Sequence, residues 1–374
     1  MGQSKCKKSG ETGIFSAFFL TMIVRLDTMQ HTSGCFHLMQ WVQRTGEFAP
    51  EGMEEMRNKP VTKGSILFLA LAGVLTAGTS ARANLFSYTG SIQTYTVTQT
   101  GIYDITAAGA QGGTSASGGG GLGAALGGDV TLTAGTVLDI VAGGQGLTGN
   151  VDPSTEGAGG GGGSFVFVSG ASQPLIVAGG GGGAGYTTTD GGPGQSSTNG
   201  QNGSDNGGGT GGKGGTGGLG GGGGSSTYGD GGGGAGYLGN GGGTAEGGYG
   251  GLGGFGPATF AGGAGATQGV PNPNGGFGGG GGGGFLAGGG GGGYSGGGGG
   301  SGINSYGGGG GGSYTAASFT GVVFDPANSG NGSVNISFVA AVPEPGTFAV
   351  GGLAIPALGF WAWKKRRNAV ALQG

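Results

Sequence analysis

The sequence predicts an all-β fold: a jelly-roll-like sandwich of short strands that carries a long glycine-rich insertion. Three observations lead to this prediction. Glycine supplies 114 of the 374 residues, and only 8% of the residues are charged. Short runs of β-branched and aromatic residues lie on both sides of the glycine-rich part. Turn-forming residues separate these runs, a spacing that is typical of sandwiches and jelly rolls.

Eight short segments have the alternation or composition of strands. The first two are expected to form a hairpin across Gly101. The third and fourth, and the fifth and sixth, are expected to be further pairs joined by short turns. The segments are residues 92–98, 102–107, 129–133, 137–141, 164–169, 174–178, 321–324 and 333–339.

The glycine-rich insertion, residues 179–312, is expected between the sixth and seventh of these strands. Each glycine in the interior of an ordinary helix or strand costs about 0.5–1 kcal/mol relative to alanine. The insertion is therefore either disordered, or it satisfies its backbone in a way that only glycine permits. Collagen is excluded, because glycine does not recur strictly at every third position and the chain has only 12 prolines. The strands on both sides favour order, since the insertion must leave and rejoin one body.

Charge excludes one class of partner. Between Asn84 and Val342 the only basic residue is Lys213, against eight Asp and two Glu, which gives a net charge of −9. A segment of this kind cannot neutralise phosphates, so no binding of nucleic acid is expected.

The distribution of reactive side chains argues against an enzyme. Both cysteines (Cys6, Cys35) and both histidines (His31, His37) lie in the first 37 residues, which leaves the remainder without a thiol, a disulfide or a histidine base. Matches to phosphate-binding loops and nucleophile elbows in the glycine runs lack the partner residues that those motifs need. The acids are scattered and are expected at solvated turns: Asp129, Asp139, Asp152, Asp190, Asp205 and Asp230. No catalytic, cofactor-binding or metal-binding residue is predicted.

The N-terminal part contains a secretory signal, predicted at residues 56–83. A basic segment (Arg57, Lys59, Lys63) precedes an apolar run at residues 66–75. The small residues Ala81 and Ala83 then form a cleavage site, which predicts a mature chain that begins at Asn84. Residues 1–55 are interpreted as a spurious extension upstream of the true start. The alternative is a genuine extension with an internal anchor.

The C-terminal segment, residues 341–374, has three parts in a fixed order. Val342, Pro343, Glu344 and Pro345 are followed by a mostly apolar run at residues 347–363 and then by Lys364, Lys365, Arg366 and Arg367. Seventeen residues of helix span about 25 Å, so a short transmembrane helix is predicted. The four basic residues are expected to stay in the cytoplasm, which places the glycine-rich body outside.

This order resembles the PEP-CTERM sorting signal of Gram-negative bacteria. The resemblance covers residues 343–367. It implies a transient form anchored in the inner membrane, cleavage near Pro343-Glu344-Pro345 by an exosortase-type membrane protease, and release to the cell surface. It also implies a setting of exopolysaccharide production and of biofilm or floc matrix, which makes exopolysaccharide an expected partner. An ordinary tail anchor, the alternative, would not explain Pro-Glu-Pro.

Residues 86–339 resemble the glycine-rich domain of the anaplastic-lymphoma-kinase and leukocyte-tyrosine-kinase receptors. The similarity rests on Phe86–Gly90, Gly109–Gly113, Gly160–Val168, Pro174–Gly183 and Gly309–Tyr314. It implies a tumour-necrosis-factor-like jelly roll that carries a bundle of polyglycine helices, in which glycine N–H groups bond sideways to neighbouring helices. Single aromatic residues, such as Tyr237, Tyr249, Phe255, Phe277, Phe285 and Tyr294, are expected at edges or turns of the bundle. The receptors' cysteines are missing, so signalling and cytokine binding are not carried over.

We therefore expect an exported, non-enzymatic protein of the cell surface or extracellular matrix. The alternative is an adhesin-like module that binds a polysaccharide or a protein through the loops of the sandwich. An enzyme ranks third.

Overall fold

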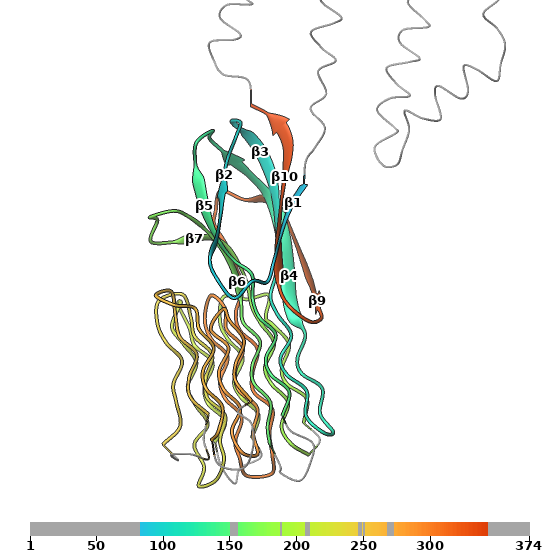
Figure 1. Ribbon diagram of the computed structural model, residues 1–374, viewed down its shortest axis with the longest axis vertical. Coiled ribbons are helices and arrows are strands. Elements are labelled where there is room, and N and C mark those ends of the chain that lie inside the picture. Colours follow the sequence, from blue (N-terminus) through green and yellow to red (C-terminus); the bar gives the residue numbers. More distant parts are fainter. Residues whose placement is uncertain are drawn as a thin grey trace, which may run out of the picture. The chain divides into compact units, whose positions relative to one another are not determined.

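The computed structural model describes residues 83–149, 156–187, 189–205, 210–245, 249, 251–267 and 273–342. All of them belong to one compact unit, Ser80–Gly374. Each regular element among them is a strand, and the strands form two five-stranded antiparallel sheets (Figure 1). The strands are β1 (Ala83–Ser87), β2 (Gln93–Thr96), β3 (Gly101–Ala108), β4 (Gly123–Leu132), β5 (Val137–Val141), β6 (Ser164–Val168), β7 (Pro174–Ala178), β8 (Tyr314–Thr315), β9 (Thr320–Asn328) and β10 (Ser333–Ala341). The predicted all-β class is confirmed.

The predicted transmembrane helix, residues 347–363, lies outside the described residues. Within the described ranges, no helix is long and apolar enough to cross a membrane.

Strand pairing confirms one of the expected pairs and corrects two. The sheets have the orders β1-β10-β3-β4-β9 and β2-β5-β6-β7-β8. β6 and β7 pair as expected. The expected hairpin of residues 92–98 with 102–107 is wrong, because β2 pairs with β5 whereas β3 lies between β10 and β4. The third and fourth segments are likewise not paired, since β4 and β5 belong to different sheets.

Both short links are corners of the sandwich. Alternate residues of β3 and β5, including Tyr103, Ile105, Leu138 and Ile140, are buried together in the core between the sheets. Strands in opposite sheets turn these faces toward each other, whereas a hairpin would place them side by side. Period-two alternation identifies the buried face of a strand but not the sheet that contains it.

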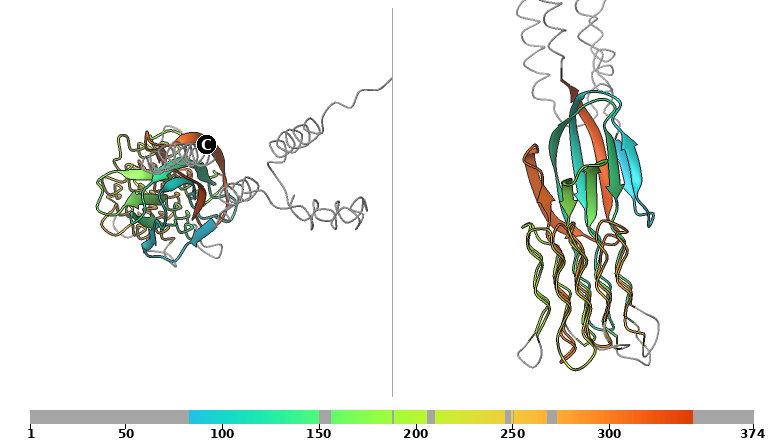
Figure 2. Two further views of the ribbon diagram at one scale, coloured as in Figure 1. Left: turned by 90° about the horizontal axis from the view of Figure 1, so that it is seen from above. Right: turned by 90° about the vertical axis from the view of Figure 1, so that its left-hand side faces the viewer.

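The glycine-rich segments form an ordered assembly at one end of the sandwich, here called the glycine array (Figures 1 and 2). It comprises the described parts of residues 109–122, 142–149, 156–163 and 179–313. The expectation of a single insertion between the sixth and seventh strands needs correction. The longest part connects β7 to β8, but stretches between β3 and β4 and between β5 and β6 also join the array.

Hydrogen bonding in the array repeats every three residues. Along residues 157–163, the acceptor of successive N–H groups rotates among three neighbouring segments: residues 278–284, 181–184 and 144–147. The bonds run from Gly157 to Gly284, Ala158 to Ala184, Gly159 to Leu147, Gly160 to Gly281, Gly161 to Gly181, Gly162 to Gly144 and Gly163 to Gly278, at 2.8–3.1 Å. The N–H groups of one segment therefore donate to three neighbouring segments, and its carbonyls accept from others, such as residues 110–113 and 289–292, whereas a strand in a sheet has two bonded neighbours.

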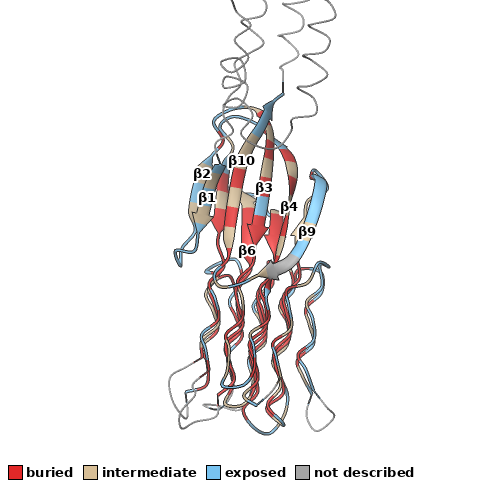
Figure 3. Cartoon of the chain, turned by 90° about the vertical axis from the view of Figure 1, so that its right-hand side faces the viewer, coloured by how far each residue is buried: buried red, intermediate tan, exposed pale blue. Residues whose placement is uncertain are grey.

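Most positions of the array require glycine because a side chain would not fit there, and not because the backbone has a dihedral angle that only glycine adopts. A Cβ added to Gly161, Gly182 or Gly291 would come closer to a neighbouring carbonyl oxygen than the 3.0 Å that real Cβ atoms keep. Among the array glycines that the structure describes, positive φ occurs only at a few turn positions, such as Gly218 (+92°) and Gly229 (+68°). The segments thus lie so close together that a side chain cannot fit between them, and Figure 3 shows much of the array as buried.

Aromatic residues join the array to the second sheet. Phe165 and Phe167 of β6 project from the face opposite the core, where Phe260 from a turn of the array packs on both rings at centroid distances of 4.9 and 6.1 Å. Beside them, the ring of Tyr294 stacks on Tyr237 at 4.7 Å and on Tyr314 at 4.5 Å. Several aromatics expected at turns thus build a second hydrophobic core.

Candidate functional site

The last strand ends at the end of the sandwich away from the array, and the first strand begins midway along the same sheet. Ala83 pairs with Ser337, and Ala341 pairs with Gly101, whereas Ser333 pairs with Ala108 next to the array. Asn84, the predicted mature N-terminus, lies in β1 opposite Ile336. The chain therefore enters the described body midway along the first sheet, running toward the array, and leaves it at the end opposite the array.

Most residues of the predicted processing sites lie outside the described ranges. Ala83, Asn84 and Val342 are described, and Val342 is exposed directly after β10. Ala81, Pro343, Glu344, Pro345, Lys364, Lys365, Arg366 and Arg367 are not described.

The far turns of the array lie a long way from this end of the sandwich. The eight residues of β3 extend over about 26 Å at a strand's rise per residue. Seven array residues, such as 157–163, extend over about 22 Å at the rise of an extended threefold helix. The far turns thus lie roughly 50 Å from the end where β10 ends.

An acidic hollow of about 460 Å³ lies on the outer face of the first sheet, over β3, β4 and β9. Asp104 and Asp129 face each other across the β3–β4 pair, and Asp325 lines the same hollow. Partial burial, and secondarily the Asp129 carboxylate, raise the pKa of Asp104 above its ordinary value. Two carboxyl groups are thus brought together that are distant in the sequence.

The hollow has little with which to hold a ligand. Its described lining residues include no histidine, no basic residue and no aromatic ring. Gly127 and Gly128, which also line it, contribute no side chain. Within the described ranges, no group of three or more His, Cys, Asp or Glu is arranged to hold a metal ion. Asp129 and Asp139 lie in strands rather than at turns, which corrects their expected placement.

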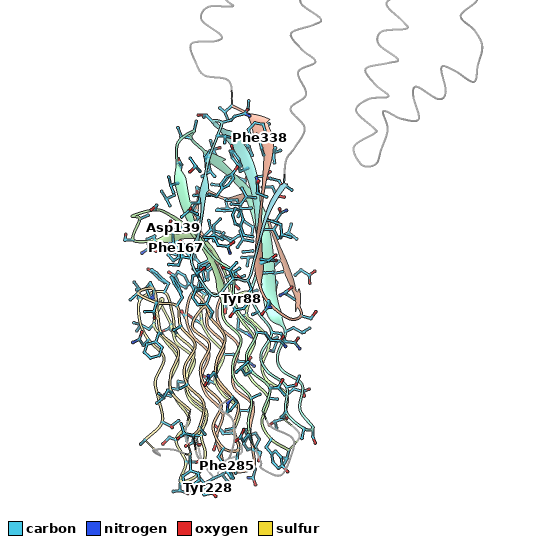
Figure 4. The ribbon with its side chains drawn as sticks, viewed as in Figure 1. Tyr88, Asp139, Phe167, Tyr228, Phe285 and Phe338 are labelled. Atoms are coloured by element: carbon cyan, nitrogen blue, oxygen red, sulfur yellow. The ribbon has the colours of Figure 1, made fainter. Side chains whose placement is uncertain are left out.

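A cluster of aromatic side chains lies on the far turns of the array and is here called the aromatic tip. It consists of Tyr228, Tyr249 and Phe285, and Figure 4 places Tyr228 and Phe285 at the end remote from the sandwich. The Tyr228 and Tyr249 rings stack at 5.6 Å, and Phe285 stands edge-on to both at 5.6 and 5.9 Å. Each of the two tyrosines remains exposed.

A buried carboxylate fixes the turn that carries Tyr228. Asp230 is only 1% exposed, which corrects its expected solvated position. It accepts hydrogen bonds from the N–H and Oγ of Ser226, both at 2.6 Å, and from the Gly302 N–H at 2.7 Å. The Phe285 N–H donates to the Tyr249 carbonyl at 2.9 Å. The tip is therefore held by the Asp230 carboxyl group and by its own backbone, which preorganises its rings.

Sequence reasoning did not identify the aromatic tip, although it expected Tyr249 and Phe285 at edges or turns. Its three rings come from turns that are far apart along the chain, and only the array brings those turns together. Comparisons of the chain with protein-family models and with curated proteins gave no match.

Proposed function

We propose that this chain is an exported, non-enzymatic protein of the cell surface or extracellular matrix of a Gram-negative bacterium, sorted by its C-terminal Pro-Glu-Pro segment. One observation carries the proposal. β10 ends at the end of the sandwich opposite the array, and β1 begins midway along the sheet and runs toward the array. A precursor held in the inner membrane by residues 347–363 would therefore display the array away from the membrane, and one cut near Pro343-Glu344-Pro345 would leave the body intact.

The finer architecture belongs to the same proposal. We interpret the array as a bundle of polyglycine helices, which the three-residue period of its hydrogen bonds supports. The links that cross between the sheets, β1 to β2, β2 to β3, β4 to β5 and β8 to β9, support a jelly-roll-like sandwich. Such a bundle is built from backbone hydrogen bonds rather than from a large apolar core, which suits a structural element outside the cell.

Cell fractionation tests the sorting step. Replacing Pro343, Glu344 and Pro345 by alanine should keep the protein in the inner membrane at its uncut mass, while the natural chain reaches the surface or medium in a shorter form. Asp205→Ala, which changes an exposed carboxyl of the array, is the matched control and should be sorted normally. Surface delivery of the triple variant would refute sorting by this motif.

Deletion of the gene tests the role in the matrix. We expect weaker flocs or biofilms, restored by the natural chain but not by the triple variant. A matrix of unchanged strength would refute the structural role, and hydrolase activity of the purified protein would refute the non-enzymatic assignment.

The second candidate is an adhesin-like module for a polysaccharide or a protein. The exposed aromatic tip favours it, and this surface lies on the array instead of on the sandwich loops first expected.

A further inference from the structure

An apolar stripe extends from the aromatic tip along one outer segment of the array. It consists of Tyr249, Leu252 and Phe255, which are 38%, 49% and 42% exposed. In an extended helix with three residues per turn, side chains at this spacing lie on one face. Successive side chains of the stripe are therefore about 9 Å apart. Tyr228, 47% exposed, adds a further ring at the end of the stripe.

Packing within the array accounts for only part of the stripe, since Tyr249 stacks on Tyr228 and Phe285 and still remains 38% exposed. Most of the neighbouring positions are glycines, and the buried positions of the same segment, Gly251, Gly253 and Gly254, meet neighbouring backbone. The aromatics that hold the array to the sandwich, such as Phe260 and Tyr237, are by contrast buried. Exposed apolar groups in a contiguous row mark interaction surfaces on soluble proteins.

We propose that the stripe and the aromatic tip together bind an extended, uncharged polysaccharide. Sugar rings linked through equatorial bonds present flat C–H faces, which stack on tyrosine and phenylalanine rings. The stripe's 9 Å repeat is comparable with the length of a disaccharide unit in such a chain. The hydroxyls of Tyr228 and Tyr249 lie at the stripe's end and can bond to sugar hydroxyls.

Charge selects the class of polysaccharide. The segment from Asn84 to Val342 carries a net charge of −9, and its only base is Lys213. A polyanion would be repelled at low salt, and the stripe has no cationic side chain to bind carboxylates or sulfates. An uncharged polymer meets no such barrier. This inference deepens the proposed function, because it names the polymer that the exported array would contact in the matrix.

Affinity electrophoresis of the full chain in mild detergent tests the proposal. Hydroxyethylcellulose, an uncharged β-linked glucan, should retard the protein, and alginate, a polyanion, should not. Tyr249→Ala should weaken the retardation about tenfold, the scale of a central aromatic contact. Tyr249→Phe keeps the ring and should bind nearly as the natural chain does. Tyr88→Ala is the matched control: Tyr88 is also exposed, at 41%, and contacts a phenylalanine, but it lies next to the sandwich.

Melting curves show whether each variant is folded. Should Tyr249→Ala melt early, Phe255→Ser provides the same test at an exposed ring on the other end of the stripe. Equal binding of the natural chain and the folded stripe variants would overturn the proposal. So would equal retardation by alginate, or no retardation at all.

A second copy of the chain is the competing occupant of the stripe. Light scattering that shows a dimer for the natural chain and a monomer for Tyr249→Ala, without glucan binding, would assign the stripe to self-association and overturn the proposal. None of these results bears on sorting, since failure of the proposed function would instead appear as surface delivery of the Pro-Glu-Pro variant.

Discussion

Two neighbouring glycines allow a direct test of close packing in the array. Gly221 is buried, and a Cβ on it would overlap the Gly297 carbonyl. Gly222 follows it in the same segment, and a Cβ there would meet no atom closer than 3.5 Å, which is an ordinary contact. Neither residue has a positive φ. The two substitutions to alanine therefore share local sequence and backbone region, and differ in the space that each methyl group finds.

The expected effects have opposite signs. Gly221→Ala must push two backbone segments apart, and overpacking of this kind costs about 1–3 kcal/mol. The shift also strains the hydrogen bonds from Gly221 to Gly234 and from Gly242 to Gly221, at 2.9 and 2.8 Å, where one lost buried bond adds about 1–3 kcal/mol. A total near 3 kcal/mol lowers the melting temperature by about 6–12 °C for a domain of this size. Gly222→Ala reduces only the entropy of the unfolded chain, which stabilises by about 0.4–1 kcal/mol.

Calorimetric melts of the natural chain and the two variants measure this difference. Amide exchange of the same samples shows whether the loss is local, since the neighbours of Gly221 should lose protection first. Equal melting temperatures for the two variants, or rapid exchange throughout residues 210–245 of the natural chain, would refute a closely packed array and return the tract to the disordered alternative.

Three further predictions test other parts of the body. Trypsin should not cleave after Lys213 in the native chain, because the Gly222 N–H donates a hydrogen bond to the Lys213 carbonyl at 2.8 Å. Cleavage at this site should appear after heating. Rapid cleavage of the native chain, measured by mass spectrometry, would contradict an ordered array. Phe260→Ala should lower the free energy of unfolding by about 3 kcal/mol, which denaturant unfolding measures. An unchanged unfolding midpoint would show that the second core contributes nothing to stability. The raised pKa of Asp104 means that its ionised form destabilises the fold above that pKa, so stability should rise as pH falls through it. Asp104→Asn should stabilise at neutral pH, by roughly 0.2–1 kcal/mol, because it removes a partly buried charge that also faces a like charge. The variant should also flatten the rise in stability on acidification, and an unchanged pH profile of the melting temperature would exclude Asp104 as the source of that rise.

The sequence predicts the strands more reliably than their partners. β6 and β7 have strong β-branched runs and a short link, and they pair as expected. β4 is longer than its expected segment, since it begins at Gly123. The sequence obscured this extension, because Gly127 and Gly128 resemble the glycine tract although they lie in a strand. Partners across the sandwich depend on tertiary packing, which alternation does not encode.

The candidate surfaces were harder to foresee for the same reason. The carboxyl of Asp230 bonds to Gly302, which lies 72 residues further along the chain. Asp104 meets Asp129 only through the register of β3 with β4. In both cases the residues that meet are fixed by the array or by the sheet, and no local motif identifies them.

The residues that interrupt glycine in the array follow a physical rule. Lys213, Leu219 and Leu252 are exposed, so their side chains leave the bundle. The buried exceptions, such as Ala158, Ala184 and Ala235, have the smallest side chain that carries a Cβ. Large apolar residues thus occur where the array meets solvent or the sandwich, and they report which face of each segment is free. The three-residue spacing of the exposed side chains of Tyr249, Leu252 and Phe255 therefore carries information about function, because the close packing of the array does not dictate which residues occupy that face.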